Sequence, residues 1–174
     1  MNKMIIDQAH SEIGFKVKHL MISTVKGNFT TFSGGVEEDG SVSISINVNS
    51  INTSNADRDN HLKSADFFNS EEFPTIDFAG KMTEDMETIT GEITIKGITK
   101  EVTLDVDYNG KGIDPWGNTK HGWEISGWIN RGDFGLTWNA PLETGGVLVS
   151  EEVKLNLDVQ MMEVVEEMET SSPA

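Results

Sequence analysis

The chain has 174 residues, 36% of them hydrophobic, which suits one domain with a single core. It carries 13 lysines and arginines against 29 aspartates and glutamates, a formal net charge of −16. Such a surface repels a phosphate backbone, so no nucleic-acid binding is expected. The lack of cysteine excludes disulfides and thiol chemistry.

The two ends of the chain carry no targeting or membrane signal. The opening residues, MNKMIIDQAHSE, contain no apolar run of a signal peptide, and no segment approaches the ~18 apolar residues of a membrane span. The cytoplasm is therefore the expected compartment, and no stable membrane insertion is expected. Residues 164–174 carry glutamates and no base, which predicts a disordered acidic tail after one domain at 1–163.

The segment Asp7–His19 has the pattern of a half-buried strand. Ile13, Phe15 and Val17 alternate with charged residues and glycine, so they share one face. That face begins with an aspartate and ends with a histidine. An inward face that is apolar in its middle and polar at its end would suit a barrel that holds an amphiphile.

Similar alternation recurs along the chain. Further strands are predicted at Gly27–Gly34, Ser41–Asn49, Thr75–Met82, Thr88–Lys96, Ile98–Asn109, Lys120–Arg131 and Ser150–Met161. The spacing of Phe29 and Phe32 implies a bulge or one outward ring in the first of these. Leu20–Lys26 is interpreted as a short helical turn, and Ser54–Phe68 as the one helix, centred near residues 55–65.

About eight one-faced strands, mostly joined as antiparallel neighbours, predict an all-β fold. Closing them into a barrel removes the exposed edges. At this strand number the interior is either filled with side chains or holds one small ligand. A two-sheet sandwich is the alternative architecture.

Motifs for catalysis or metal binding are not found. The segment Asp57–Phe68 superficially resembles a calcium loop, but Leu62 and Phe68 stand where glycine and glutamate are needed. The four histidines share no metal-ligand spacing. No metal and no cofactor is therefore expected.

Two arginines and one histidine are candidates for polar contacts. Arg58 lies beside an aspartate and Arg131 lies near Asp133, which suggests bidentate anchoring of a carboxylate. This anchoring would either pin the helix to the barrel or hold a ligand headgroup. His19 is either a satisfied residue at a strand end or a polar contact for a ligand.

Several motifs, in order along the chain, resemble those of the YceI-like family. They are Asp7-x-x-His10-Ser11-x-x-x-Phe15-x-Val17-x-His19, Gly27-x-Phe29-x-x-Phe32-x-Gly34, Arg58-Asp59-x-His61-Leu62-Lys63-Ser64-x-Asp66-Phe67-Phe68, and Arg131-x-Asp133-Phe134-Gly135-Leu136-x-Trp138. The resemblance implies a lipocalin-like antiparallel barrel that binds a polyisoprenoid, an isoprenoid quinone or a fatty amide in its lumen. It implies no catalysis.

The leading hypothesis is a non-enzymatic carrier or store whose partner is a long-chain lipid or isoprenoid. Strand parity places three candidates together on the first inward face, and two phenylalanines after the helix would cap the mouth. The expected ligand contacts are Phe15, Val17, His19, Phe29, Phe32, Val42, Ile44, Ile46, Arg58, His61, Leu62, Phe67, Phe68, Phe78, Ile93, Ile95 and Trp138. Formation of a homodimer stays open.

Two other hypotheses remain. An enzyme could use the same cavity on an isoprenoid or quinone, with Asp59, His61 and His19 as acid and base. Alternatively, a filled barrel could serve as an interaction scaffold that makes contact through its acidic tail. A cavity too small for a lipid chain would favour the scaffold.

Overall fold

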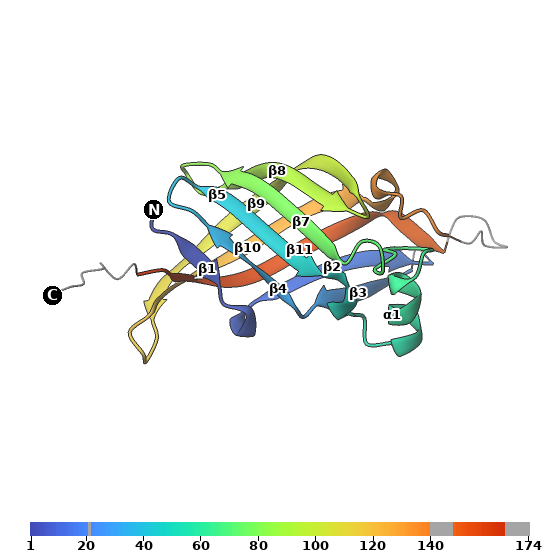
Figure 1. Ribbon diagram of the computed structural model, residues 1–174, viewed down its shortest axis with the longest axis horizontal. Coiled ribbons are helices and arrows are strands. Elements are labelled where there is room, and N and C mark those ends of the chain that lie inside the picture. Colours follow the sequence, from blue (N-terminus) through green and yellow to red (C-terminus); the bar gives the residue numbers. More distant parts are fainter. Residues whose placement is uncertain (21, 140–147, 166–174) are drawn as a thin grey trace.

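The computed structural model describes residues 1–20, 22–139 and 148–165 (Figure 1). The predicted tail therefore lies almost wholly outside the described residues. The strands are β1 (Met4–Ile6), β2 (Glu12–His19), β3 (Ser23–Phe29), β4 (Phe32–Val36), β5 (Ser41–Asn47), β6 (Ile51–Asn52), β7 (Thr75–Met82), β8 (Thr88–Ile95), β9 (Ile98–Ile113), β10 (Thr119–Asn130) and β11 (Val149–Glu163). The helices are α1 (Ala56–Lys63) and three short 3-10 turns, η1 (Gln8–His10), η2 (Val48–Ser50) and η3 (Arg131–Phe134).

The strands form a closed antiparallel barrel. β1 and β2 are two halves of one strand, as are β3 and β4, and β5 and β6. Counted this way, eight strands follow one another around the barrel, each paired with its neighbours in the chain. The ring closes because β11 pairs with both β1 and β2. The predicted all-β barrel with a single α-helix is confirmed, and the sandwich alternative is wrong.

The barrel forms because alternate side chains of each strand are apolar. In β7, Ile76, Phe78 and Met82 are buried, whereas Asp77, Ala79 and Lys81 between them are exposed. The same alternation in β5 and β8 turns their isoleucines and valines inward. Burial of these inner faces gives one continuous apolar core, and it is the main stabilising contribution.

The predicted strand Asp7–His19 is interrupted by η1. The interruption removes Asp7 from the inward face of β2. Its carboxylate instead accepts a hydrogen bond from Lys120 and lies 2.8 Å from Nδ1 of His10. The interpretation of a polar group at the start of the inward face was therefore wrong, because a single 3-10 turn resets strand parity.

The region around Phe29 and Phe32 also differs from the prediction. β3 ends at Phe29, β4 begins at Phe32, and both rings are buried. The two residues between the strands form a break, so neither a bulge nor an outward ring is needed. The predicted helical turn at Leu20–Lys26 is wrong, because β3 already begins at Ser23.

The α-helix is shorter than the predicted Ser54–Phe68. Asn55 caps it, accepting a hydrogen bond from the Arg58 backbone N–H at 2.9 Å, and it ends at Lys63. No residue of α1 is fully buried. The helix lies beside one end of the barrel, whereas the N-terminus and the β9–β10 hairpin lie at the other end (Figure 1).

Candidate functional site: an apolar cavity in the barrel

The barrel encloses a cavity of about 160 Å³. Nearly every strand and the region after α1 contribute to its wall, and the described lining side chains are aliphatic or phenylalanine except for Gly14 and Arg131. A wall of this composition offers dispersion contacts and almost no hydrogen bonds. It therefore suits a hydrocarbon chain rather than a polar substrate.

Most of the predicted ligand residues line this cavity. They are Phe15, Val17, Phe29, Val42, Ile44, Ile46, Leu62, Phe67, Phe68, Phe78, Ile93 and Ile95. Their contact with a ligand stays a prediction. The cavity wall also contains residues that the sequence interpretation missed, including Ile13, Ile76, Ile89, Leu104, Ile125 and Leu155. The same period-2 alternation could have identified them.

The other five predicted ligand residues lie outside the cavity wall. Phe32 is buried in the core, and His19 is half-buried at the end of β2, opposite Ser23. Arg58 donates from Nε to the Thr53 hydroxyl at 2.8 Å and from Nη2 to the Thr53 carbonyl at 2.7 Å. The Arg58 guanidinium therefore binds the loop before α1 and not the cavity.

His61 and Trp138, the last two of these residues, stand directly behind the cavity wall. The His61 ring contacts Phe67 edge-on with centroids 5.1 Å apart, and it contacts Trp138 at 4.8 Å. Its Nε2 lies 2.9 Å from a carboxylate oxygen of Asp66. His61 therefore supports Phe67 from outside the cavity.

Aromatic rings cluster where the cavity meets the α1 end of the barrel. Phe29 lies 5.7 Å from Phe15 and 6.3 Å from Phe68, measured between ring centroids, and Phe67 lies 5.5 Å from Trp138. We call Phe29, Phe67, Phe68 and Trp138 the aromatic cap. These rings stand between the lumen and the α1 segment.

Arg131 is the one charged side chain among the described residues of the cavity wall. It is 5% exposed, and its guanidinium donates to the backbone carbonyls of Leu136 (2.6 Å), Ser150 (2.8 Å), Trp138 (2.9 Å) and Val149 (3.2 Å). Burial lowers the pKa of this guanidinium from its usual range. The predicted anchoring of a carboxylate was wrong for both arginines, because each binds carbonyl or hydroxyl oxygens.

The three acid–base candidates also lie away from the cavity. Asp59 accepts hydrogen bonds from the Thr53 backbone N–H at 2.9 Å and from its hydroxyl, and His61 faces Asp66. Within the described part of the chain, no group of three or more His, Cys, Asp or Glu side chains could hold a metal ion.

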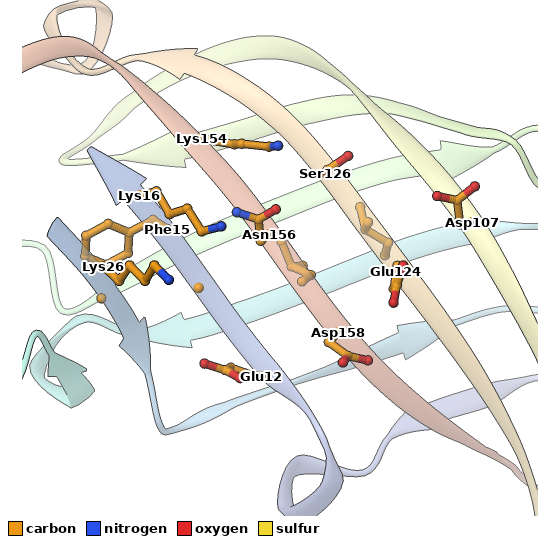
Figure 2. Close-up of a pocket in the computed structure, with 14 residues that line it drawn as sticks. Glu12, Phe15, Lys16, Lys26, Asp107, Glu124, Ser126, Lys154, Asn156 and Asp158 are labelled. Atoms are coloured by element: carbon orange, nitrogen blue, oxygen red, sulfur yellow. The ribbon is translucent and has the colours of Figure 1, made fainter. Parts of the chain in front are cut away.

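A second hollow, of about 440 Å³, lies on the outer face of β2, β3, β9, β10 and β11. Figure 2 shows lysine side chains on one side of it and carboxylates on the other. The charged residues around it are Lys16, Lys26, Lys154, Glu12, Asp107, Glu124 and Asp158. Gly14 borders both hollows, so only the sheet separates the outer one from the lumen.

A closed eight-stranded antiparallel barrel around an apolar cavity, with one helix at its end, is a lipocalin-like architecture. Residues 5–161 match the YceI-like domain, and the chain belongs to that family. The UPF0312 protein SAS2572 of Staphylococcus aureus is 42% identical over 167 residues, which span 92% of this chain and 97% of the relative.

Solved structures with the same fold extend this comparison. The YCEI protein of Campylobacter jejuni has a TM-score of 0.71 at 35% identity, covering 91% of this chain and 96% of its own. A polyisoprenoid binding domain from Saccharophagus degradans has a TM-score of 0.70 at 13% identity, covering 94% and 99%. BcnA of Burkholderia cenocepacia has a TM-score of 0.75 at 21% identity, covering 89% and 98%. At 13% and 21% identity, the last two show the fold alone.

Proposed function

We propose that the barrel binds the hydrocarbon chain of one long amphiphile, such as a polyisoprenoid, an isoprenoid quinone or a fatty amide, and carries or stores it without chemical change. The observation that carries this proposal is the continuous apolar wall. Among the wall residues that the structure describes, only Arg131 is charged, and it already donates to four backbone carbonyls. The description of the Saccharophagus neighbour as polyisoprenoid binding agrees with this ligand class.

Burial of a hydrocarbon chain supplies enough free energy for such a carrier. Each CH₂ group moved from water to an apolar wall contributes about 0.8 kcal/mol, so a few isoprene units outweigh the cost of association without specific hydrogen bonds. The polar end of the ligand would then stay at the aromatic cap, because the described part of the wall offers no free polar group for it. Affinity should therefore follow chain length more than headgroup identity.

The cavity must expand to hold a long chain. Its volume of about 160 Å³ is close to the roughly 150 Å³ of an engineered apolar cavity that binds one benzene molecule. Phe15, Phe29 and Phe68 are partly or fully buried and line the cavity, so rotation of these rings is the simplest source of extra length. In this proposal the empty and the loaded barrel differ in the orientation of the rings in and around the aromatic cap.

The positions of the candidate acids and bases support a binding role over an enzymatic one. Asp59, His61 and His19 do not line the cavity, so none could reach a group on a chain held inside. The small volume, by contrast, favours the second candidate function, a filled barrel that serves as an interaction scaffold. The two functions differ in whether the barrel takes up a chain.

A series of prenols of increasing length tests the proposal. We expect the dissociation constant to fall with each added isoprene unit until the lumen is full. The variant Ile44→Trp, which fills the lumen from β5, should lose this binding. The matched variant Ser43→Trp, on the outer face of the same strand, should keep it. Equal binding by both variants, or no uptake by the unaltered protein, would exclude a ligand in the lumen.

A further inference from the structure

Three lysines form a row across adjacent strands on the outside of the barrel. Lys16 on β2 lies directly opposite Lys26 on β3 and directly opposite Lys154 on β11. Their side chains extend over the same outer surface in Figure 2. Like charges placed opposite one another on neighbouring strands destabilise a sheet. The row therefore lowers the stability of the barrel, and its presence is not explained by a contribution to folding.

These lysines also lack the acidic partners that Lys120 and Lys3 have. Lys120 is paired with Asp7, and Lys3 lies 3.6 Å from a carboxylate oxygen of Glu37. Among the residues that the structure describes, no carboxylate lies within 4.0 Å of the three ammonium groups in the row. In a chain of net charge −16, a row of unpaired cations marks a surface suited to an external anion.

Exposed apolar side chains flank the row. Trp128 on β10 is 60% exposed, and the Lys154 ammonium lies 5.9 Å from the centroid of its ring. Ile22, in the turn between β2 and β3, is 84% exposed. Tryptophan is enriched at membrane–water interfaces, and reversible membrane binding generally needs an apolar and a basic contribution together.

The charges along β2 change sign toward this turn. Glu12 lies at the acidic side of the outer hollow, Lys16 and Lys18 follow, and Ile22 stands beyond the strand end. Lys16 lies four residues, or about 13 Å, from Glu12 along the strand. That separation exceeds the ~8 Å Debye length at physiological salt, so the acidic side is largely screened from a contact made at the turn.

From this arrangement we infer that the outer face of the β2–β3 hairpin, together with the neighbouring part of β10 and β11, is a docking surface for a membrane that carries anionic phospholipid headgroups. Ile22 enters the interface, and the lysines contact the phosphates. We call this surface the basic hairpin face, and its residues are Lys16, Lys18, Lys26, Lys154, Trp128 and Ile22. The inner sides of the same strands contribute Phe15, Val17 and Leu155 to the cavity, so docking places the cavity wall against the membrane.

Charge complementarity selects an anionic lipid surface. Each lysine near such a surface strengthens binding by about fivefold. Glu151 and Glu152 lie near the start of β11, the strand that pairs with β2. Among the described residues they form no ion pair with these lysines, and their charges keep the attraction modest. The expected docking is therefore reversible and sensitive to salt, as delivery or collection of a lipid requires. It does not depend on which chain the cavity holds.

Sedimentation with sucrose-loaded vesicles tests the inference. One set contains phosphatidylcholine alone, and the other contains equal parts of phosphatidylcholine and phosphatidylglycerol. The full chain should sediment with the anionic set and much less with the neutral set, and added salt should reduce binding. Lys16→Glu/Lys26→Glu should weaken binding by roughly tenfold or more. The charge-matched control Lys100→Glu/Lys111→Glu, on β9, should bind nearly as well as the unaltered protein.

Two results would overturn the inference: equal binding to both vesicle sets, or equal loss in both double variants. Dimerisation in analytical ultracentrifugation that only Lys16→Glu/Lys26→Glu abolishes, without vesicle binding, would instead assign this face to a second copy of the chain. Ile44→Trp, which blocks the lumen, should still sediment with anionic vesicles. Failure of the carrier function and failure of docking are therefore distinguishable.

Discussion

Replacement of Arg131 by methionine should destabilise the barrel strongly, because this side chain joins two segments that flank the cavity. Its guanidinium binds Leu136 and Trp138 after η3 as well as Val149 and Ser150 at the start of β11. Each hydrogen bond from a charged donor contributes about 1.5–3 kcal/mol. The desolvation of a buried cation offsets part of that sum, which leaves an expected loss of roughly 3–5 kcal/mol.

Urea unfolding followed by tryptophan fluorescence measures this loss as a lower midpoint at unchanged slope. Arg131→Lys should recover little of it, because an ammonium cannot reproduce the geometry of the guanidinium fork. Arg58→Met is the control, since the Arg58 guanidinium is only part-buried and its Nε and Nη2 bonds both go to Thr53. Water can replace these part-buried bonds, so this variant should cost only about 1 kcal/mol. A stability of Arg131→Met within 1 kcal/mol of the unaltered protein would refute the assigned role.

Three further outcomes are expected. Phe15→Asp should abolish uptake of a long prenol, because it places a carboxylate in an apolar wall, whereas Phe15→Leu should retain uptake in the same titration. Phe68→Ala should speed both uptake and release in stopped-flow measurements, because it thins the aromatic cap. The hydrogen bond from Lys120 lowers the pKa of Asp7, so stability present above the ordinary carboxyl pKa is lost as pH falls through the lowered folded-state value. Unfolding free energies measured from roughly pH 5 to pH 2 should therefore decline less steeply in Asp7→Asn, and equal slopes would contradict this pairing.

The barrel could be predicted from the sequence because apolar residues at every second position of a strand are the ones that form its inner wall. Ile44, Phe78 and Ile93 could be placed on the inward side from their strands alone, and they line the cavity. The alternation did not reveal where strands are interrupted. A 3-10 turn before Glu12 and a two-residue break after Phe29 each reset the parity, and neither has a distinctive residue pattern.

The polar residues were harder to place than the apolar ones. Arg58 and Arg131 stand beside aspartates in the sequence, yet both bind oxygens of other residues in the fold. The spacing of residues along the sequence cannot show which backbone carbonyls still need a hydrogen-bond donor after the strands have paired. The lysine row was equally hidden, because Lys26, Lys16 and Lys154 come together only through the register of three strands.

Native mass spectrometry of the purified protein, followed by organic extraction, tests the central claim most directly. The proposed carrier function predicts an adduct with the mass of one isoprenoid or acyl chain, lost on denaturation and recovered in the extract. Ile44→Trp should lack this adduct, whereas Ser43→Trp should retain it. A protein mass without adduct, unchanged after incubation with a quinone or a prenol, would contradict the carrier function and favour the filled-barrel scaffold.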